Sequence, residues 1–194
     1  MIKASLLAGV DEAGRGALAG PVVSAAVILT DDIPRDCLKD SKSLSKKERE
    51  NVYNLIVEKT PYIGIGIVSI EKIDSINILQ ATLISMEKAI RALPTVPDEI
   101  MIDGNKSPKL PMYKIKTIVK GDQRISEISA ASIIAKVTRD QIMAEYHQRY
   151  PQYNFQENNG YGTEQHYESI FQYGISKIHR KSFNLTRQPT LFHT

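Results

Sequence analysis

The residues best suited to chemistry are two adjacent carboxylates, Asp11 and Glu12. They follow an apolar run and lie within the stretch Gly9-Val10-Asp11-Glu12-Ala13-Gly14-Arg15-Gly16. Neighbouring side chains of a strand point to opposite faces, so both acids can serve one site only if the strand ends there and the backbone turns. Carboxylates beside a buried strand also need a compensating cation, and Arg15 or a metal ion could supply it.

This stretch has two other interpretations. The first is a surface turn with a solvated acidic pair, which is common in turns, but the flanking glycines and apolar runs count against it. The second is a nucleotide-binding glycine loop. We reject it because the spacing Gly14-x-Gly16-x-x-x-Gly20 is one residue too long for G-x-G-x-x-G, and a β-branched run follows instead of a helix.

Two more carboxylates repeat the arrangement of an acid beside a glycine at the end of an expected strand. Asp103 closes an apolar run and precedes Gly104, and Asp122 follows Gly121 after a later apolar run. Taken alone, each is an ordinary Asp-Gly turn. Together with Asp11 they suggest one site built from several strand ends.

The fourth acid has a rival in Asp140. Asp140 lies well along an expected helix, where it can pair with Lys136 at i−4, so we prefer Asp122. We expect Lys136, Arg139 and Asp140 to lie on a solvated or ion-paired helix face.

Four carboxylates with no accompanying Cys or His cluster suit a hard cation that prefers oxygen ligands. This favours Mg²⁺ or Mn²⁺ over Zn²⁺. Four acids in one site would repel one another unless divalent ions compensated them. Two such ions about 4 Å apart are the usual apparatus for in-line attack of water on a phosphodiester. The residues alone therefore predict metal-dependent phosphodiester hydrolysis.

These side chains must be positioned by a framework of alternating strands and helices. Apolar runs and periodicity predict strands over 6–10, 22–29, 62–70, 99–102 and 113–119, and helices over 45–59, 76–93, 125–150 and 163–173. Ser45 and Glu48 form a capping-box pattern at the start of the first helix. Gly64 and Gly66 alternate with isoleucines, which indicates close backbone approach at that strand.

Composition places the chain in a broad class. It has 194 residues, a net charge of +3 and one cysteine, Cys37. With no partner for a disulfide, no signal sequence and no apolar run near 18 residues, we expect a soluble, cytoplasmic protein with no membrane partner. No amphipathic heptad or obvious partner helix points beyond a monomer. The basic residues of the last third suggest a polyanionic partner; they are Arg139, Arg149, Lys177, His179, Arg180, Lys181 and Arg187.

Two further residues could contact that partner. Lys42, in Asp40-Ser41-Lys42-Ser43, is either a solvated lysine or a phosphate contact. Tyr161 stands between Gly160 and Gly162, where it either anchors the loop on the core or is poised to stack on a flat group.

Several of these motifs stand together in the order found in bacterial ribonuclease HII, and the chain resembles that family over about residues 6–183. The matching segments are Gly-Val-Asp-Glu-Ala-Gly-Arg-Gly, Asp-Ser-Lys, Ile-Asp-Gly, Val-Lys-Gly-Asp, Ala-Ala-Ser-Ile-Ile-Ala-Lys-Val-Thr-Arg-Asp, Gly-Tyr-Gly-Thr and His-Arg-Lys-Ser-Phe. The resemblance implies an α/β, ribonuclease H-like fold with a mixed sheet flanked by helices. It divides the chain into a catalytic domain (1–150), a continuous helical extension that binds substrate (151–183) and a flexible tail (184–194).

The resemblance also implies an activity and roles for residues. The activity is endonucleolytic cleavage of RNA in RNA–DNA hybrids, including a lone ribonucleotide within duplex DNA, leaving 5′-phosphate and 3′-hydroxyl ends. The acids that match the family's metal ligands, for Mg²⁺ or Mn²⁺, are Asp11, Glu12, Asp103 and Asp122. The residues that match its substrate contacts are Gly14, Arg15 and Gly16 at the 2′-hydroxyl, Tyr161 at the following deoxyribose, and Lys42 near the backbone.

The physical argument agrees with these roles. The 2′-hydroxyl is what distinguishes RNA from DNA at one position, and a glycine loop lets main-chain groups approach it. A flat aromatic ring packs on a sugar that lacks this hydroxyl. The chain departs from the family at Ala17, where proline is frequent, and at Gln123-Arg124, where serine and lysine are frequent. Neither change removes a ligand.

Two rival functions share part of this pattern. A junction resolvase or transposase-type nuclease would use the same acids and metals, but it would lack the Gly14–Gly16 loop and Tyr161. A non-catalytic hybrid-binding module would have no use for four acids, which would repel phosphate without metal.

The last residues carry a separate motif. Gln188-Pro189-Thr190-Leu191-Phe192 resembles the Gln-x-x-Leu-Phe peptide with which bacterial replication proteins dock on the sliding clamp. Its terminal position suits a docking tail, with Gln188, Leu191 and Phe192 as the contact residues.

Overall fold

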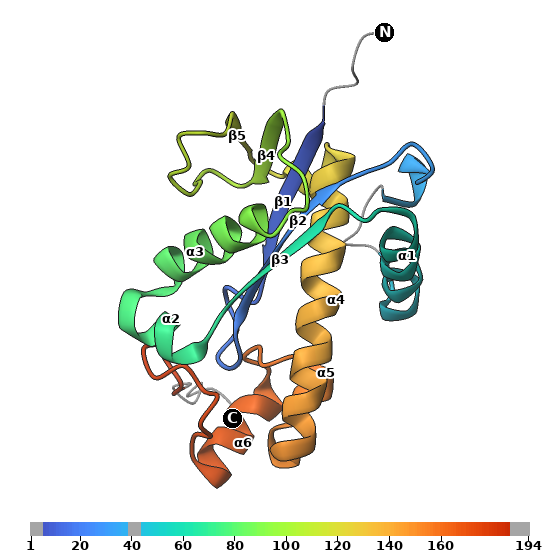
Figure 1. The fold of residues 1–194 in the computed structure, drawn as a ribbon. Helices are drawn as coiled ribbons and strands as arrows, with labels where there is room; N and C mark the ends of the chain where they lie inside the picture. Colours follow the sequence, from blue (N-terminus) through green and yellow to red (C-terminus); the bar gives the residue numbers. More distant parts are fainter. Residues whose placement is uncertain (1–5, 39–43, 187–194) are drawn as a thin grey trace, which may run out of the picture.

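A five-stranded mixed sheet forms the centre of the protein in this computed structural model, which describes residues 6–38 and 44–186 (Figure 1). The strands are β1 (Leu7–Ala13), β2 (Val22–Ile28), β3 (Ile63–Val68), β4 (Glu99–Asp103) and β5 (Ile115–Ile118). Their order in the sheet is β3-β2-β1-β4-β5. The pairs β1–β2 and β2–β3 are antiparallel, whereas β1–β4 and β4–β5 are parallel.

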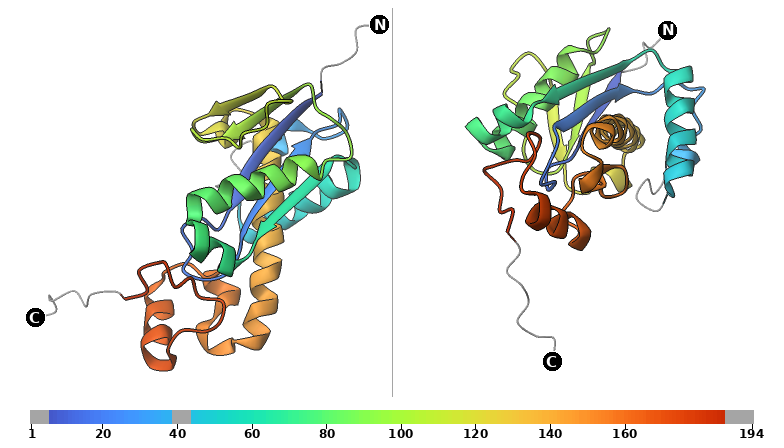
Figure 2. Two further views of the ribbon diagram at one scale, coloured as in Figure 1. Left: turned by 60° about the vertical axis from the view of Figure 1, so that its left-hand side comes forward. Right: turned by 90° about the horizontal axis from the view of Figure 1, so that it is seen from below.

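Helices cover both faces of this sheet. They are α1 (Lys46–Lys59), α2 (Ile70–Ile76), α3 (Ile78–Arg91), α4 (Ser126–Arg149), α5 (Phe155–Asn158) and α6 (Glu164–Tyr173), and three short 3₁₀ turns join them, η1 (Arg35–Leu38), η2 (Gly121–Gln123) and η3 (Pro151–Tyr153). The long helix α4 crosses one face with α1 beside it, and α3 lies on the other face (Figure 2). We call residues 150–186, which include α5 and α6 below the sheet in Figure 1, the C-terminal lobe.

Strand β2 is buried along its whole length because side chains on both of its faces pack into a hydrophobic core. Ala25 and Val27 pack with α4 on one face, and the alternate residues Ala26 and Ile28 pack with α3 on the other. A strand covered on both faces is apolar throughout, which is how this segment reads in the sequence.

Helix α3 lies unusually close to strand β3. A Cβ atom on Gly66 would stand 1.9 Å from the backbone oxygen of Ser85 in α3, so only glycine fits there. The close backbone approach predicted from this strand's glycines is therefore confirmed. The capping box of Ser45 and Glu48 at α1 is also confirmed, with both of its hydrogen bonds formed.

Three local predictions were wrong. The helix predicted over 76–93 is α3 and begins only at Ile78, because Asn77 adopts a φ of 70° and its side chain caps α3; the separate helix α2 before it was not predicted. Strand β1 does not end before the acids but continues to Ala13, since β2 pairs with it through both acidic residues. Asp122 lies in η2, beyond the end of β5.

Within the described ranges, no helix has both the length and the apolar character needed to cross a bilayer.

Candidate active site

The four predicted acids line one pocket of about 320 Å³. Asp11 and Glu12 come from β1, Asp103 is the last residue of β4, and Asp122 comes from η2. The parallel pairing of β1 with β4 stops at Val10, so the acids lie where these two strands separate. The pocket is also lined by Ala13, Gly14, Arg15, Gly16, Arg49, Ser132, Ile133, Lys136 and Tyr161.

Asp11 is the most strongly perturbed of these acids. It is 6% exposed, and its Oδ1 accepts the backbone N–H of Glu12 at 2.7 Å. Burial, followed by the nearby carboxylates of Glu12 and Asp103, holds the pKa of Asp11 well above its usual range, although a hydrogen bond from Ser132 opposes this. An ionised Asp11 is therefore costly unless a cation lies beside it.

Glu12 has a partial cationic partner. Its Oε1 accepts from Arg15 Nη1 at 3.1 Å, the compensation expected from the sequence. Burial nevertheless raises the pKa of Glu12 above its usual value, against the lowering effect of Arg15. Because the Arg15 side chain is half exposed, this ion pair compensates only part of the charge that the pocket holds.

A hydrogen bond from the main chain beside Asp122 to the side chain of Asp103 brings the other two acids together. The Gly121 N–H donates to Asp103 Oδ1 at 2.7 Å, which brings η2 and its Asp122 to the end of β4. The left-handed backbone of Lys120, with a φ of 56°, turns the chain into η2 at this point. Asp122 is 3% exposed.

The donor set of this pocket fits a hard divalent cation. Four carboxylates offer oxygen ligands, and a divalent ion would offset the burial and the mutual repulsion that raise the pKa of Asp11. In the described segments, however, no three His, Cys, Asp or Glu side chains are already drawn together as a metal cage.

Two buried arginines fix the loop that follows the acids. Arg180 is fully buried and donates to the carbonyl oxygens of Gly14 (2.7 Å) and Arg15 (3.0 Å), and further to those of Gly20 and Pro21. Arg139 is 1% exposed and donates to the carbonyls of Ala19, Pro21 and Asn159. The expectation that Arg139 lies on a solvated or ion-paired helix face was wrong.

Gly14 is a position where only glycine fits. Its φ is +90°, and a Cβ there would stand 2.1 Å from Arg139 Nε. Gly16 differs, because nothing lies within 4 Å of where its Cβ would be. One glycine thus makes room for the buried arginine, while the other leaves open space beside the pocket.

Tyr161 reaches the same pocket from the C-terminal lobe. Its side chain is 42% exposed, and the Arg139 guanidinium lies 5.3 Å from its ring centroid. Gly160, next to it, accepts hydrogen bonds from the backbone N–H groups of Leu18 and Ala19, which ties the lobe to the loop. The aromatic ring between glycines is therefore held at the pocket with one side available.

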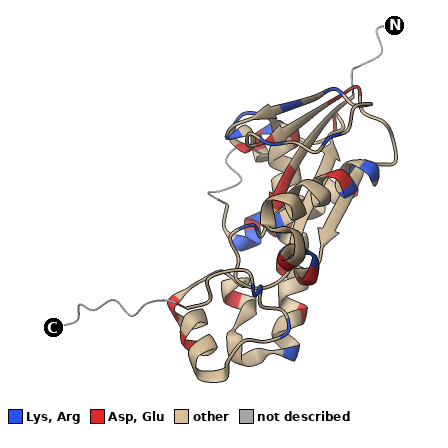
Figure 3. Ribbon diagram, turned by 90° about the vertical axis from the view of Figure 1, so that its left-hand side faces the viewer, with Lys and Arg blue, Asp and Glu red and all other residues tan. Residues whose placement is uncertain are grey.

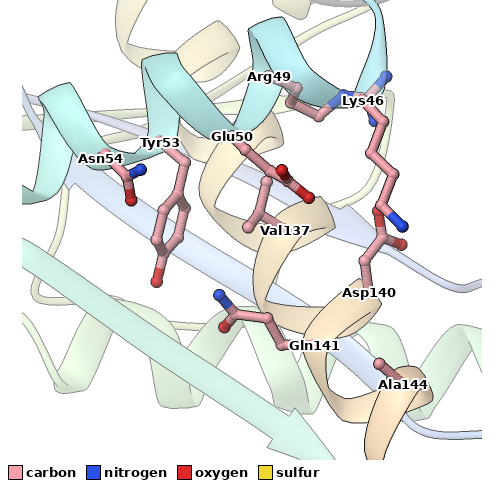
Figure 4. Close-up of a pocket in the computed structure, with 9 residues that line it drawn as sticks. All are labelled: Lys46, Arg49, Glu50, Tyr53, Asn54, Val137, Asp140, Gln141 and Ala144. Carbon is pink, nitrogen blue, oxygen red and sulfur yellow. The ribbon is translucent and has the colours of Figure 1, made fainter.

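Asp140 lies elsewhere. It lines a second pocket of about 270 Å³ between α1 and α4, where the Lys46 side chain points toward it (Figure 4). Burial raises the pKa of Asp140, opposed by Lys136, Arg139, Arg49 and Lys46. Of the two rivals, Asp122 shares the pocket of the other three acids. Arg49 lines both pockets.

The basic C-terminal region is less available to a polyanion than its composition indicates. Arg139 and Arg180 point inward, and His179 is 1% exposed. The side shown in Figure 3 has acidic and basic residues interspersed in the C-terminal lobe.

Some predicted residues fall outside the described ranges, namely Lys42, Gln188, Leu191 and Phe192. Conversely, sequence reasoning missed Arg49, Ser132 and Lys136 as lining residues of the acidic pocket. Ser132 and Lys136 are four residues apart on α4 and so share one helix face, which is the signal that could have identified them.

Comparisons with known proteins agree on one family. The model of the family described as Ribonuclease HII matches residues 8–186. A ribonuclease HII from Coxiella burnetii is 50% identical over 187 residues, which cover 96% of this chain and 92% of that protein.

Solved structures agree as well. The crystal structure of ribonuclease H2 from Pyrococcus horikoshii OT3 matches with a TM-score of 0.76 at 28% identity, covering 92% of this chain and 94% of that one. A chain of the PCNA:RNase HII complex from Archaeoglobus fulgidus matches with a TM-score of 0.76 at 26% identity, covering 96% and 98%. The expected ribonuclease H-like fold is confirmed.

Proposed function

The chain belongs to the ribonuclease HII family and is a metal-dependent endoribonuclease that acts on RNA–DNA hybrids; we propose that it also nicks duplex DNA at a single embedded ribonucleotide. The products would be 5′-phosphate and 3′-hydroxyl ends. One observation supports this most directly: the Gly14–Gly16 loop and Tyr161 line the same pocket as the four acids. The residues proposed to recognise the sugar of the ribonucleotide would then lie beside the acids proposed to hydrolyse the phosphodiester.

The proposed ligands of Mg²⁺ or Mn²⁺ are Asp11, Glu12, Asp103 and Asp122. Two bound ions would supply an activated water and stabilise the charge of the phosphate during hydrolysis. The protein's own part is to hold these oxygens at the ends of adjacent elements. The raised pKa of Asp11 means that the folded pocket favours a cation there, or else a proton.

The proposed substrate contacts surround these acids. Main-chain groups of Gly14, Arg15 and Gly16 would meet the 2′-hydroxyl, which both donates and accepts hydrogen bonds. The half-exposed ring of Tyr161 would pack on the deoxyribose that follows. Lys42, outside the described residues, would lie near the backbone of the substrate.

The test is cleavage of a labelled DNA duplex that contains one ribonucleotide, with Mg²⁺ or Mn²⁺, beside an all-DNA control. We expect a nick on the 5′ side of the ribonucleotide, abolished by EDTA and by Asp11→Asn. Equal cutting of the all-DNA duplex would instead favour a general nuclease. Hybrid binding with no nick in either metal would favour a binding module.

We further propose that the tail docks on a sliding clamp through Gln188, Leu191 and Phe192, which lie outside the described residues. A relative from Archaeoglobus fulgidus was solved in a complex with PCNA, which supports the idea of a clamp partner. Clamp pull-down should succeed with the whole chain and fail when residues 188–194 are removed. Failure of the whole chain to bind would end this proposal.

These activities together suggest a place in the cell. Nicking at a lone ribonucleotide would begin ribonucleotide excision repair, and a single cysteine suits the reducing cytoplasm.

A further inference from the structure

Two buried histidines in the C-terminal lobe contact each other. His166 is fully buried, His179 is 1% exposed, and their Nε2 atoms lie 3.0 Å apart. At this distance one imidazole donates a proton and the other accepts it. Their outer nitrogens determine which ring does which.

The direction of the hydrogen bonds follows from one backbone amide. The Ser176 N–H points at His179 Nδ1 at 2.9 Å, so this nitrogen accepts and carries no proton. His179 must then donate from Nε2 to Nε2 of His166. His166 is left with its proton on Nδ1, which donates to the carbonyl oxygen of Tyr161 at 2.8 Å. The chain of donors therefore ends on the main chain of the pocket tyrosine.

This arrangement requires both rings to be neutral. A further proton between the rings would set two N–H groups against each other, and one on His179 Nδ1 would deprive the Ser176 N–H of its acceptor, with only the Ser176 hydroxyl oxygen, 2.8 Å away, to receive it. Burial lowers the pKa of His166, and burial together with the neighbouring His166 lowers the pKa of His179 to about 4. The titratable side chain packed on both rings is Tyr153, while Arg180, next in the chain, directs its guanidinium to the loop carbonyls.

We propose that His166 and His179 are positioning residues for the cleavage reaction, a neutral pair that fixes the backbone of Tyr161 and thereby the ring at the substrate pocket. The proposal rests on the proposed contact of Tyr161 with substrate. Other bonds to this residue are main-chain ones, from Thr163 and to Asn158, so His166 provides the side-chain donor that anchors it.

A fluorescence experiment tests the positioning without any substrate. The chain has no tryptophan, so Tyr161→Trp places a single reporter at the site. In that protein, His166→Leu removes the donor, whereas His166→Asn keeps an amide N–H near the place of Nδ1. We expect the anisotropy of Trp emission to fall with leucine and to stay near the parent value with asparagine. His147→Asn, on α4, is the control and should change nothing.

A titration covers the case in which the leucine variant does not fold. The Tyr161→Trp protein with both histidines intact should lose anisotropy as the pH falls from 6.5 through about 4, the pKa of His179, while circular dichroism shows that its helices persist. Unchanged anisotropy in this titration, or an equal loss with asparagine and leucine, would overturn the proposal.

Activity separates this proposal from the one on which it rests. With Tyr161 intact, His166→Leu should raise KM for the ribonucleotide duplex about three- to tenfold, the equivalent of one hydrogen bond, and leave kcat within about twofold. His166→Asn should restore KM. If anisotropy falls as expected while KM is unchanged, the positioning stands and the contact of Tyr161 with substrate is wrong.

Discussion

Arg180 Nη2 lies 2.7 Å from the carbonyl oxygen of Gly14, so a residue late in the chain holds the loop beside the first two acids. The same guanidinium reaches three more carbonyls of that loop. A planar group with five donors can do this, and the four carbonyl partners explain how this buried cation is tolerated. The shape of the loop therefore depends on a residue outside the ribonuclease H-like sheet.

Replacing Arg180 should damage both stability and substrate binding. Lysine has three donors at a single point and cannot span four carbonyls, so Arg180→Lys leaves buried oxygens without donors. We expect a loss of about 2–4 kcal/mol in the free energy of unfolding, measured in urea, and a raised KM for the hybrid. Lys177→Ala, an exposed change nearby, is the control and should leave stability within about 0.5 kcal/mol. Wild-type stability of Arg180→Lys would contradict this account.

Gly14 and Gly16 should respond differently to alanine. Gly14→Ala forces a Cβ against Arg139 at a φ of +90°, so we expect a marked loss of stability, about 1–3 kcal/mol or more. Gly16→Ala meets empty space, so the protein should fold normally. If the substrate sugar approaches this loop, the added methyl group should nonetheless weaken cleavage at a single ribonucleotide. Thermal unfolding and cleavage of the same two preparations distinguish the effects; full activity of Gly16→Ala would argue against close approach of the sugar.

The sequence was sufficient to predict the acids of the pocket, but not the buried arginines that hold the neighbouring loop. Asp11, Asp103 and Asp122 could be found because each follows an apolar run and stands beside a glycine or another acid, a local pattern. Arg139 and Arg180 could not, because most of their partners are carbonyl oxygens more than a hundred residues away, and a sequence does not show which main-chain oxygens will accept hydrogen bonds. From composition, both arginines were therefore predicted to be surface charges, although in the structure they are buried and hydrogen-bonded within the core.

The boundaries of some strands and helices were predicted wrongly for a related reason. Strand β1 extends through Asp11 and Glu12 because β2 pairs with it there, and pairing partners are not visible in one strand alone. The break at Asn77 depends on a left-handed backbone that asparagine tolerates, which periodicity does not reveal. Close helix–strand packing was predictable, since glycines that alternate along β3 have few other uses.

Without divalent ions, stability should depend on pH in a direction set by the acidic pocket. The folded-state pKa of Asp11 and of Glu12 is raised, mainly by burial, so each binds its proton more tightly when folded. Their contribution is fully present below the ordinary values of 3.8 and 4.5 and is lost as pH rises through the raised ones. The folded-state pKa values of His166 and His179 are instead lowered by burial. Their contribution to the stability of the protein is therefore lost as the pH falls below 6.5.

The comparison that isolates the pocket is wild type against Asp11→Asn, by urea unfolding in EDTA from pH 4.5 to 8. We expect the variant to gain stability relative to wild type as pH rises. Added Mg²⁺ or Mn²⁺ should stabilise wild type more than the variant, because the ions bind the folded carboxylates. A constant difference between the two proteins at every pH would show that Asp11 is not perturbed.

Asp122 and Asp140 offer a matched pair for identifying the fourth acid. Both are aspartates with restricted exposure, but Asp122 lines the pocket of the other acids, whereas Asp140 lines the neighbouring one beside Lys46. Asp122→Asn should lower kcat by about a hundredfold or more, since it removes negative charge from the site that must hold the cations. Asp140→Asn should leave kcat within about threefold, because its carboxylate is not among the residues that line the acidic pocket. Calorimetric titration with Mn²⁺ should show weaker binding only in Asp122→Asn; the reverse ranking would assign the fourth ligand to α4.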